Sequence, residues 1–430
     1  MARRIFSILA SLRLTVVCLI AALILVFVGT LAQVDLGLYA AQAKFFRSFF
    51  VYWTPGGGHW KIPVFPGGWL IGLTLLANLL AAHVKRFKLT PGKYGILLIH
   101  SGLIFLLAGQ FMTELFQVES TMRIEVGGTR NYSEAPRLSE LAVMDVTDPD
   151  KNKVVAIPES LLAKGGEIRA PDLPFVLRVE KYLPNSMPAG PMSGEGEKMK
   201  ASEGIGRQLL FSPAPLTTGM DSEDSPAALV QVVSDKGPVG DWTVSTWMTR
   251  YPEFENLQNS LGSALGNASV TQPQGFTFGG RAWQMALRPV RYYKPFNMTL
   301  LAFNHDLYPG TDIPKNYSSK IHLNDPATGE DRDVLIYMNS PLRYRGETFY
   351  QASFEPGDRG TILQVVRNPA SITPYVACSL VALGLITQFL MHLSGFARKR
   401  ARSLQPAPPQ QTPLAPDLAP VAGNDKRSPR

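Results

Sequence analysis

Four long apolar runs constrain the fold of this chain more than any other feature of its sequence. A bilayer core is spanned by roughly 20 consecutive apolar residues in a helix. Because lipid offers the backbone no hydrogen bonds, such a run must satisfy its own polar groups, as an α-helix does. The runs extend over residues 14–31, 69–82, 94–112 and 375–396. With their flanking residues they predict transmembrane helices at 14–34, 67–84, 94–113 and 373–396.

The first run follows a basic N-terminus, so a signal peptide is an alternative to a membrane anchor. The run is long for the core of a signal peptide, and no clear small-residue cleavage site follows it. We therefore favour an uncleaved transmembrane anchor.

The distribution of basic residues predicts how these helices are oriented. The chain has a formal net charge of +8, and many of its basic residues lie beside the ends of the apolar runs. These residues are Arg3, Arg4, Arg13, Lys85, Arg86, Lys88, Lys93, Arg398, Lys399, Arg400 and Arg402. Lys and Arg next to a membrane span are typical of its cytoplasmic side, so the clustering favours membrane orientation over nucleic-acid binding.

The resulting topology has both termini in the cytoplasm. Residues 1–13, 85–93 and 397–430 are expected to be cytoplasmic, and 35–66 and 114–372 extracytoplasmic. The tail from Arg400 onward is rich in Pro, Ala and Gln, and such a composition is typical of disorder.

The polar stretch 114–372 carries strand signals. Short segments rich in β-branched and aromatic residues alternate with turn residues, which predicts a mainly antiparallel β domain and an α+β membrane protein. The expected strands are 141–146, 175–183, 228–233, 242–248, 283–293, 297–308, 318–325, 333–339, 347–354 and 361–368. Residues 185–226 are rich in Gly, Pro, Ser and Met and are interpreted as flexible, and 253–268 as one short helix.

This domain contains no cysteine. Cys18 and Cys378 both lie in apolar runs, and there is no CxxC motif, so thiol–disulfide exchange by this chain is not expected. His305, Asp306 and His322 are accompanied by no nucleophile elbow, metal-ligand pair or phosphate loop. Isolated histidines of this kind are usually structural or surface residues, so the domain is interpreted as a docking surface rather than an enzyme.

The histidines of the membrane segments are the main functional candidates. His100 lies seven residues after Lys93, which is about 10 Å along a helix from the cytoplasmic boundary. An ionisable side chain within a span is costly and marks a functional site by default. Neutral imidazole is a common axial ligand of haem iron, so we expect His100 to be a metal ligand to haem.

Each of these histidines also has a structural interpretation. His83 and His392 lie near the cytoplasmic boundary, where their rings can reach water and headgroups. His100 can instead form an interhelical hydrogen bond to Asn78 or Gln388. If haem is six-coordinate, its second axial ligand is His83 or comes from a partner subunit.

A helical wheel separates two faces of the third span. The face of His100 also carries Ile96, Leu103, Ile104, Leu107 and Phe111, which form an apolar wall for a ring. Gly95, Gly102 and Gly109 lie nearly opposite and allow close packing with another helix.

Several segments along the chain form a recognisable set. Toward the N-terminus they are SLRLTVVCLIAALILVFVGTLAQ, NLLAAHVKRFK and GILLIHSGLIFLLAG. Toward the C-terminus they are the NHDLYPG turn, the strand SSKIHL, NSPLRYRG and FYQ. With these segments the sequence resembles the ResB-like proteins of the system II pathway of cytochrome c biogenesis, and the resemblance covers about residues 5–396.

The resemblance implies a function. ResB-like proteins pair with a ResC or CcsA-like membrane subunit, carry haem across the bacterial cytoplasmic membrane and present it to apocytochrome c. It implies that His100 is an axial ligand of a transiently held b-type haem, with His83 as a further candidate. The tryptophan-rich segment expected of the partner is absent, and TPGGGHWKIPVFPGGW with His59 is a poor substitute.

The chain is therefore expected to be non-catalytic alone and to be a subunit of a cytochrome c synthase (haem lyase) complex. Thioether formation needs reduced thiols on the apocytochrome, so a thioredoxin-like thiol reductase is a further expected partner. Two alternatives remain open: a membrane-anchored scaffold or sensor without a cofactor, and a b-type haem electron-transfer subunit that uses His83 and His100.

Overall fold

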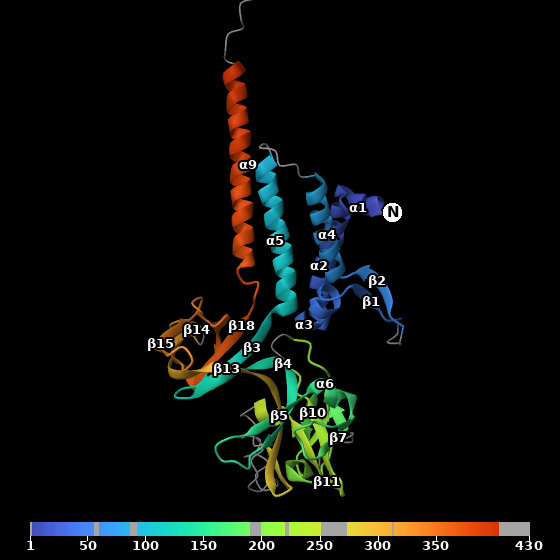
Figure 1. Ribbon diagram of the computed structural model, residues 1–430, viewed down its shortest axis with the longest axis vertical. Helices are drawn as coiled ribbons and strands as arrows, with labels where there is room; N and C mark the ends of the chain where they lie inside the picture. The colour runs from blue at the N-terminus through green and yellow to red at the C-terminus, as the bar shows by residue number, and fades with distance from the viewer. Residues whose placement is uncertain are drawn as a thin grey trace, which may run out of the picture.

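The computed structural model places a group of long helices against one end of a β domain (Figure 1). It describes residues 2–55, 60–86, 93–189, 199–219, 223–250, 273–311 and 314–403. His59 and the short helix expected at 253–268 lie outside these residues.

Four helices in the described part of the chain are long and apolar enough to cross a membrane. They are α2 (Leu12–Leu36), α4 (Gly68–Arg86), α5 (Tyr94–Phe116) and α9 (Thr373–Ser403). A short helix, α1 (Ala2–Leu9), precedes them, and Lys85 donates a hydrogen bond to Ser7 over 3.0 Å, which joins α1 to the end of α4. The prediction of membrane-suited apolar helices is confirmed.

Helix α9 is longer than expected. It continues to Ser403, beyond the expected end of the span at residue 396, so the prediction of disorder from Arg400 onward is wrong for 400–403. Ala, Arg and Lys are strong helix formers, and Arg400 and Arg402 in the last turn interact favourably with the helix dipole. Residues 404–430 lie outside the described part.

Segment 35–66, expected as a plain loop, contains regular structure. Its elements are α3 (Leu38–Ala41), the π-helix η1 (Gln42–Phe46), β1 (Phe50–Trp53) and β2 (Ile62–Pro66). β1 and β2 pair antiparallel. Phe45 and Val51 are buried with Leu25 of α2 and Ile71 of α4, so this segment packs onto the helices.

The β domain lies between α5 and α9, and all its named strand pairs are antiparallel, which confirms the predicted mainly antiparallel domain. A ten-stranded sheet has the order β15-β14-β13-β4-β3-β18-β17-β16, with β12 beside β13 and β5 beside β4. Its strands are β3 (Val118–Glu125), β4 (Thr129–Asp145), β5 (Lys153–Pro158), β12 (Gln274–Phe278), β13 (Arg281–Leu307), β14 (Pro314–Asp325), β15 (Glu330–Tyr337), β16 (Leu342–Tyr344), β17 (Glu347–Phe354) and β18 (Gly360–Arg367). A second sheet has the order β11-β10-β7-β6, from β6 (Gly166–Ile168), β7 (Val176–Leu183), β10 (Ala227–Ser234) and β11 (Gly237–Ser245).

The long strand β13 contributes to both hydrophobic cores of this domain, and its partner β4 contributes to the first. One core lies between the two sheets and includes Leu141, Leu177, Val230 and Leu287. The other is nearer the helices and includes Met122, Met298, Ile321, Phe349 and Leu363. The register of β13 against β4 shifts near Pro289 and Pro295, because proline has no N–H to donate to the ladder.

The described parts of 185–226 do not form a flexible excursion. Strands β8 (Ser186–Ala189) and β9 (Leu210–Pro213) pair antiparallel. Met199 and Phe211 are buried in a third core with Leu183 and Ala227. Long-range packing of scattered apolar residues outweighs the loop-like composition here, so this part of the prediction is corrected.

The two helices that flank the β domain continue directly into paired strands. α5 leads into β3 and β18 leads into α9, and Val118 pairs with Arg367 at the start of this ladder. The amide of Asn368 donates to Thr113 Oγ1 and Gln117 Oε1, both over 3.2 Å, which links the segment before α9 to the end of α5 at the junction.

Helix α5 packs on α9 through its glycines. A Cβ added at Gly102 would lie 2.8 Å from the Ala377 carbonyl oxygen, and one at Gly95 would lie 2.7 Å from the Gln388 backbone nitrogen. On α9, a Cβ at Gly384 would lie 2.8 Å from the Gly95 carbonyl oxygen. The predicted glycine stripe is therefore the packing surface between α5 and α9.

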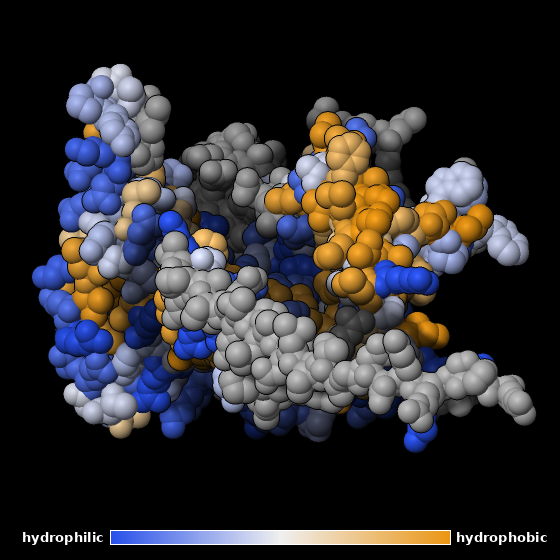
Figure 2. Space-filling view, turned by 90° about the horizontal axis from the view of Figure 1, so that it is seen from above, coloured by the Kyte–Doolittle hydropathy of each residue, from blue (hydrophilic) through white to orange (hydrophobic). Residues whose placement is uncertain are grey.

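Side-chain polarity follows this architecture. Seen along the helices from above, hydrophobic side chains gather over α2 and α4, whereas the part of the β domain that carries β14 and β15 is mainly hydrophilic (Figure 2). A hydrophobic exterior on helices and a hydrophilic exterior on strands are typical of a membrane protein with a water-exposed domain.

Candidate functional site

His100 lies in the second turn of α5, on the face away from the glycines. Its Nδ1 is 2.9 Å from the carbonyl oxygen of Ile96, one turn earlier. A carbonyl oxygen only accepts, so Nδ1 carries the proton and the lone pair of the neutral ring is on Nε2. Because the hydrogen bond also restrains the ring, it prepares Nε2 to act as a metal ligand.

The interhelical hydrogen bonds considered for His100 are made by other groups. The Asn78 amide donates to Ser11 O over 3.1 Å and accepts from Thr15 Oγ1 over 2.7 Å. The Gln388 amide nitrogen lies 2.8 Å from His392 Nε2 on its own helix. The hydrogen-bond partner seen for His100 is instead a backbone group of α5.

His83 is the other proposed cofactor ligand. It is in the last turn of α4 and is half-buried, and its charge would interact with that of His100 in the second turn of α5. His392 is exposed on α9, where Gln388 is its neighbour one turn earlier.

The two histidines of the β domain bind carboxylates. His322 Nδ1 and Nε2 each lie 3.0 Å from a carboxylate oxygen, of Asp333 and Asp331 respectively. His305 Nδ1 lies 3.1 Å from Asp358, and its ring packs on Phe354 with centroids 4.3 Å apart. Within the described residues no group of three or more His, Cys, Asp and Glu side chains is arranged to hold a metal ion.

The sequence motif NSPLRYRG forms a structural tie rather than a reactive site. Arg345 and Gly346, with φ of 45° and 78°, make the two-residue turn between β16 and β17. From this hairpin the Tyr344 hydroxyl and Arg345 Nε donate to the buried Asp325 carboxylate over 2.7 and 2.6 Å. The motif thus holds the β14–β15 turn against the β16–β17 turn.

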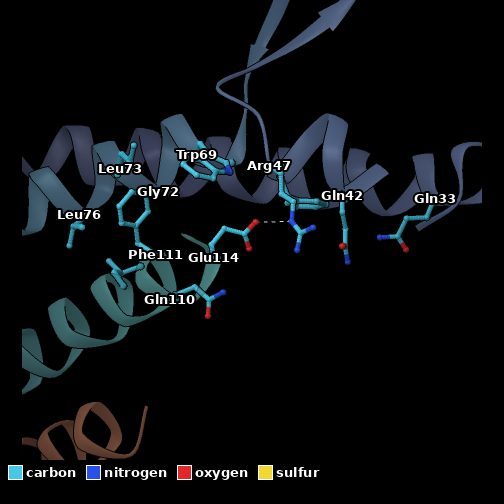
Figure 3. Close-up of a pocket in the computed structure, with 13 residues that line it drawn as sticks. Gln33, Gln42, Arg47, Trp69, Gly72, Leu73, Leu76, Gln110, Phe111 and Glu114 are labelled. Carbon is cyan, nitrogen blue, oxygen red and sulfur yellow. Dashed lines mark ion pairs between the residues drawn. The ribbon is translucent and has the colours of Figure 1, made fainter. Parts of the chain in front are cut away.

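A cavity of about 480 Å³ lies among α2, η1, α4 and α5, at the ends of the helices next to the β domain (Figure 3). Leu107 and Phe111, which share the predicted face of His100, line it together with Leu73 and Leu76 of α4. Trp69 packs edge-on against Phe111, with ring centroids 5.7 Å apart. The apolar face of α5 therefore runs from the histidines toward this cavity.

The sequence analysis did not identify the polar residues of the cavity. Arg47 Nε and Glu114 Oε1 form an ion pair over 2.7 Å, and the side chains of Gln33, Gln42 and Gln110 also line it. The available signal was the presence of polar residues in the outermost turns of apolar runs. Only the fold shows that residues from three separate segments meet there.

Comparison with known proteins identifies one family. Residues 256–362 match the ResB-like family. Over 112 residues, 26% of this chain, the sequence is 34% identical to Protein NrfI of Wolinella succinogenes, and the matched part is 12% of that protein. These matches confirm the resemblance to the ResB-like family. The family match falls on the β domain and includes neither His83 nor His100.

Proposed function

We propose that this ResB-like chain holds haem inside the membrane during cytochrome c biogenesis, with His100 as an axial ligand of the iron. The hydrogen bond between His100 Nδ1 and the Ile96 carbonyl is the observation that carries the proposal. Histidines that ligate metals commonly donate their other ring N–H to a carbonyl or carboxylate, which fixes both the tautomer and the ring orientation.

The surroundings of His100 suit a b-type haem. Ile96, Leu103 and Leu107 supply apolar surface on the same helix face, and His83 on α4 is a candidate for a second ligand that would hold the iron. A histidine of a ResC or CcsA-like partner is the other candidate. When bound, haem supplies the iron and the vinyl groups that become thioether-linked to the cysteines of apocytochrome c.

The membrane orientation is part of the same proposal. The basic ends of α4 and α9 lie away from the β domain (Figure 1), and basic residues beside a span favour the cytoplasmic side. Both termini would then be cytoplasmic and the β domain extracytoplasmic in a bacterial inner membrane. There the β domain would dock apocytochrome c or brace the partner subunit, and a thioredoxin-like reductase would keep the substrate thiols reduced.

A b-type electron-transfer subunit is the second candidate, because this chain offers two histidines, His83 on α4 and His100 on α5, as ligands for one haem. Unlike haem delivery, electron transfer by this chain would need no histidine from a partner subunit. Haem that is bound by this chain alone, requires both histidines and is reduced by added quinol would favour electron transfer over haem delivery.

The proposal is tested by maturation of c-type cytochromes in cells that express this chain with its partner. His100→Ala should lower the yield of covalently attached haem at least tenfold, and added imidazole should restore part of it by occupying the vacated axial position. His392→Ala removes an exposed imidazole from α9 and is the matched control, with an unchanged yield expected. Normal maturation in His100→Ala would refute the ligand role, provided that the variant accumulates to the wild-type level.

A further inference from the structure

The cavity beside Trp69 is graded in polarity. Leu73 and Leu76 lie toward one end, and Gln33, Gln42 and Arg47 toward the other (Figure 3). Its volume of about 480 Å³ is within the range of roughly 300–1,000 Å³ that small-molecule sites occupy. An amphipathic molecule from the bilayer, with an apolar chain and a polar head, fits this gradient.

The charges of the cavity favour a head without net charge. Arg47 and Glu114 are the charged residues among those that line it, and they neutralise each other across 2.7 Å. An anionic head would have to compete with Glu114 for the guanidinium, and a cationic head would have to compete with Arg47 for the carboxylate. Both would break a short, charge-assisted hydrogen bond.

The remaining polar groups are suited to neutral oxygens. The side-chain amides of Gln33, Gln42 and Gln110 make no hydrogen bond to any other residue in the described ranges. An amide is both a donor and an acceptor, so it can bind a carbonyl or a hydroxyl equally well. Gln33 and Gln42 are half-buried and Gln110 is exposed, so all three amides are accessible to the oxygens of a ligand in the cavity.

The walls of the cavity suit a planar ring. Trp69, Phe111 and Phe46 present aromatic surfaces, and such rings pack favourably against other flat rings. Gly68 and Gly72 of α4 also line it, and a Cβ added at Gly72 would meet no atom within 4 Å. The bare backbone at Gly72 therefore leaves room beside the aromatic side chains.

From these features we propose that the cavity binds a membrane-soluble quinone or quinol, a neutral planar ring with oxygen substituents on an apolar chain. The ring lies among the aromatic side chains, its oxygens hydrogen-bond to the glutamine amides, and the chain follows Leu73 and Leu76. The cavity contains neither His83 nor His100, so this binding is independent of the haem proposal.

The test uses the full chain purified in detergent and titrated with decylubiquinone, a short-chain quinone. Binding is measured by quenching of tryptophan fluorescence, because Trp69 lines the cavity. Saturable quenching is expected. Gly72→Leu should weaken binding at least tenfold, because Gly72 lines the cavity and a Cβ there meets no atom within 4 Å, so that a larger side chain would occupy the space of the ligand. Gln110→Leu should weaken binding about fivefold, the equivalent of one neutral hydrogen bond.

Gly395→Leu is the matched control. Gly395 lies on α9 outside the cavity, and a Cβ there also meets no atom within 4 Å, so its affinity should equal that of the wild type. Non-saturable quenching, or equal affinity in Gly72→Leu, would overturn the proposal. Phosphatidylethanolamine and phosphatidylglycerol are added separately as competitors, and displacement of decylubiquinone by either at equal mole fraction would assign the cavity to a phospholipid head instead.

Discussion

At the scale of single residues, His100 and Asp325 both depend on hydrogen bonds that decide where a proton resides. The Ile96 carbonyl sets the tautomer of His100 and leaves Nε2 as the basic nitrogen. At Asp325, burial opposes ionisation, but donors from Tyr344, Arg345 and the Ala327 N–H outweigh it and lower the pKa of the carboxyl below its ordinary 3.8. In the proposed function His100 would bind the haem iron, whereas Asp325 holds two turns together.

Asp325→Asn should lower the midpoint of thermal unfolding of the β domain at neutral pH. A depressed pKa in the folded state contributes stability that is present above the unfolded-state pKa and is lost as pH falls through the folded-state pKa. The difference in unfolding midpoint between the wild type and the variant should therefore be largest near neutral pH and shrink below about pH 4. Near-UV circular dichroism of the whole protein in detergent measures the midpoint at each pH. A difference in midpoint that does not depend on pH would count against this account.

At the scale of elements, α5 has two different faces that its sequence predicts separately. The glycines at every seventh position meet α9, and the His100 face meets α4 and the cavity. Both follow from helical periodicity, which is why both were predictable. Without a hydrophobic driving force between helices in lipid, such close backbone approach is a main source of association.

Gly102→Leu should separate α5 from α9. A Cβ at this position would already lie 2.7 Å from Val381 Cγ2 and 2.8 Å from the Ala377 carbonyl oxygen, and the backbone atom cannot move aside cheaply. Overpacking of this kind costs about 1–3 kcal/mol. The thermal unfolding midpoint in detergent should fall, whereas Gly395→Leu on the open surface of α9 should leave it unchanged. Equal midpoints for the two variants would contradict the packing described here.

Two differences from the sequence prediction have different causes. Residues 283–293 and 297–308 were expected as separate strands, yet both belong to β13, whose register against β4 shifts near Pro295. Its pairing partners in β4 and β14 lie far away in the sequence, and local patterns do not contain them. Strand β3 was not among the expected strands, although Val118, Ser120, Met122 and Ile124 alternate with charged and polar residues as a half-buried strand does.

At the scale of the whole molecule, the β domain is joined to the helices by two continuous connections. The ladder between β3 and β18 begins where α5 ends and α9 starts, and Asn368 links both sides of the junction. The β domain is thus connected directly to α5, the helix that carries His100. This arrangement suits a protein in which an external docking domain reports to a site in the membrane.

The orientation of the molecule can be tested with single cysteines. Cys18 and Cys378 are first replaced by alanine, and Asp150→Cys or Ser403→Cys is then introduced, one in a β-domain loop and one at the end of α9. A membrane-impermeant maleimide should label Asp150→Cys in intact spheroplasts and Ser403→Cys only after permeabilisation. The opposite pattern would reverse the proposed topology.

The central claim is that an imidazole between α4 and α5 holds haem iron. It is tested most directly by the visible absorption spectrum of the chain purified together with its partner subunit, normalised to protein. The wild type and His392→Ala should show the same Soret band, and His100→Ala should lose most of it. A Soret band of wild-type intensity and position in His100→Ala would contradict the claim.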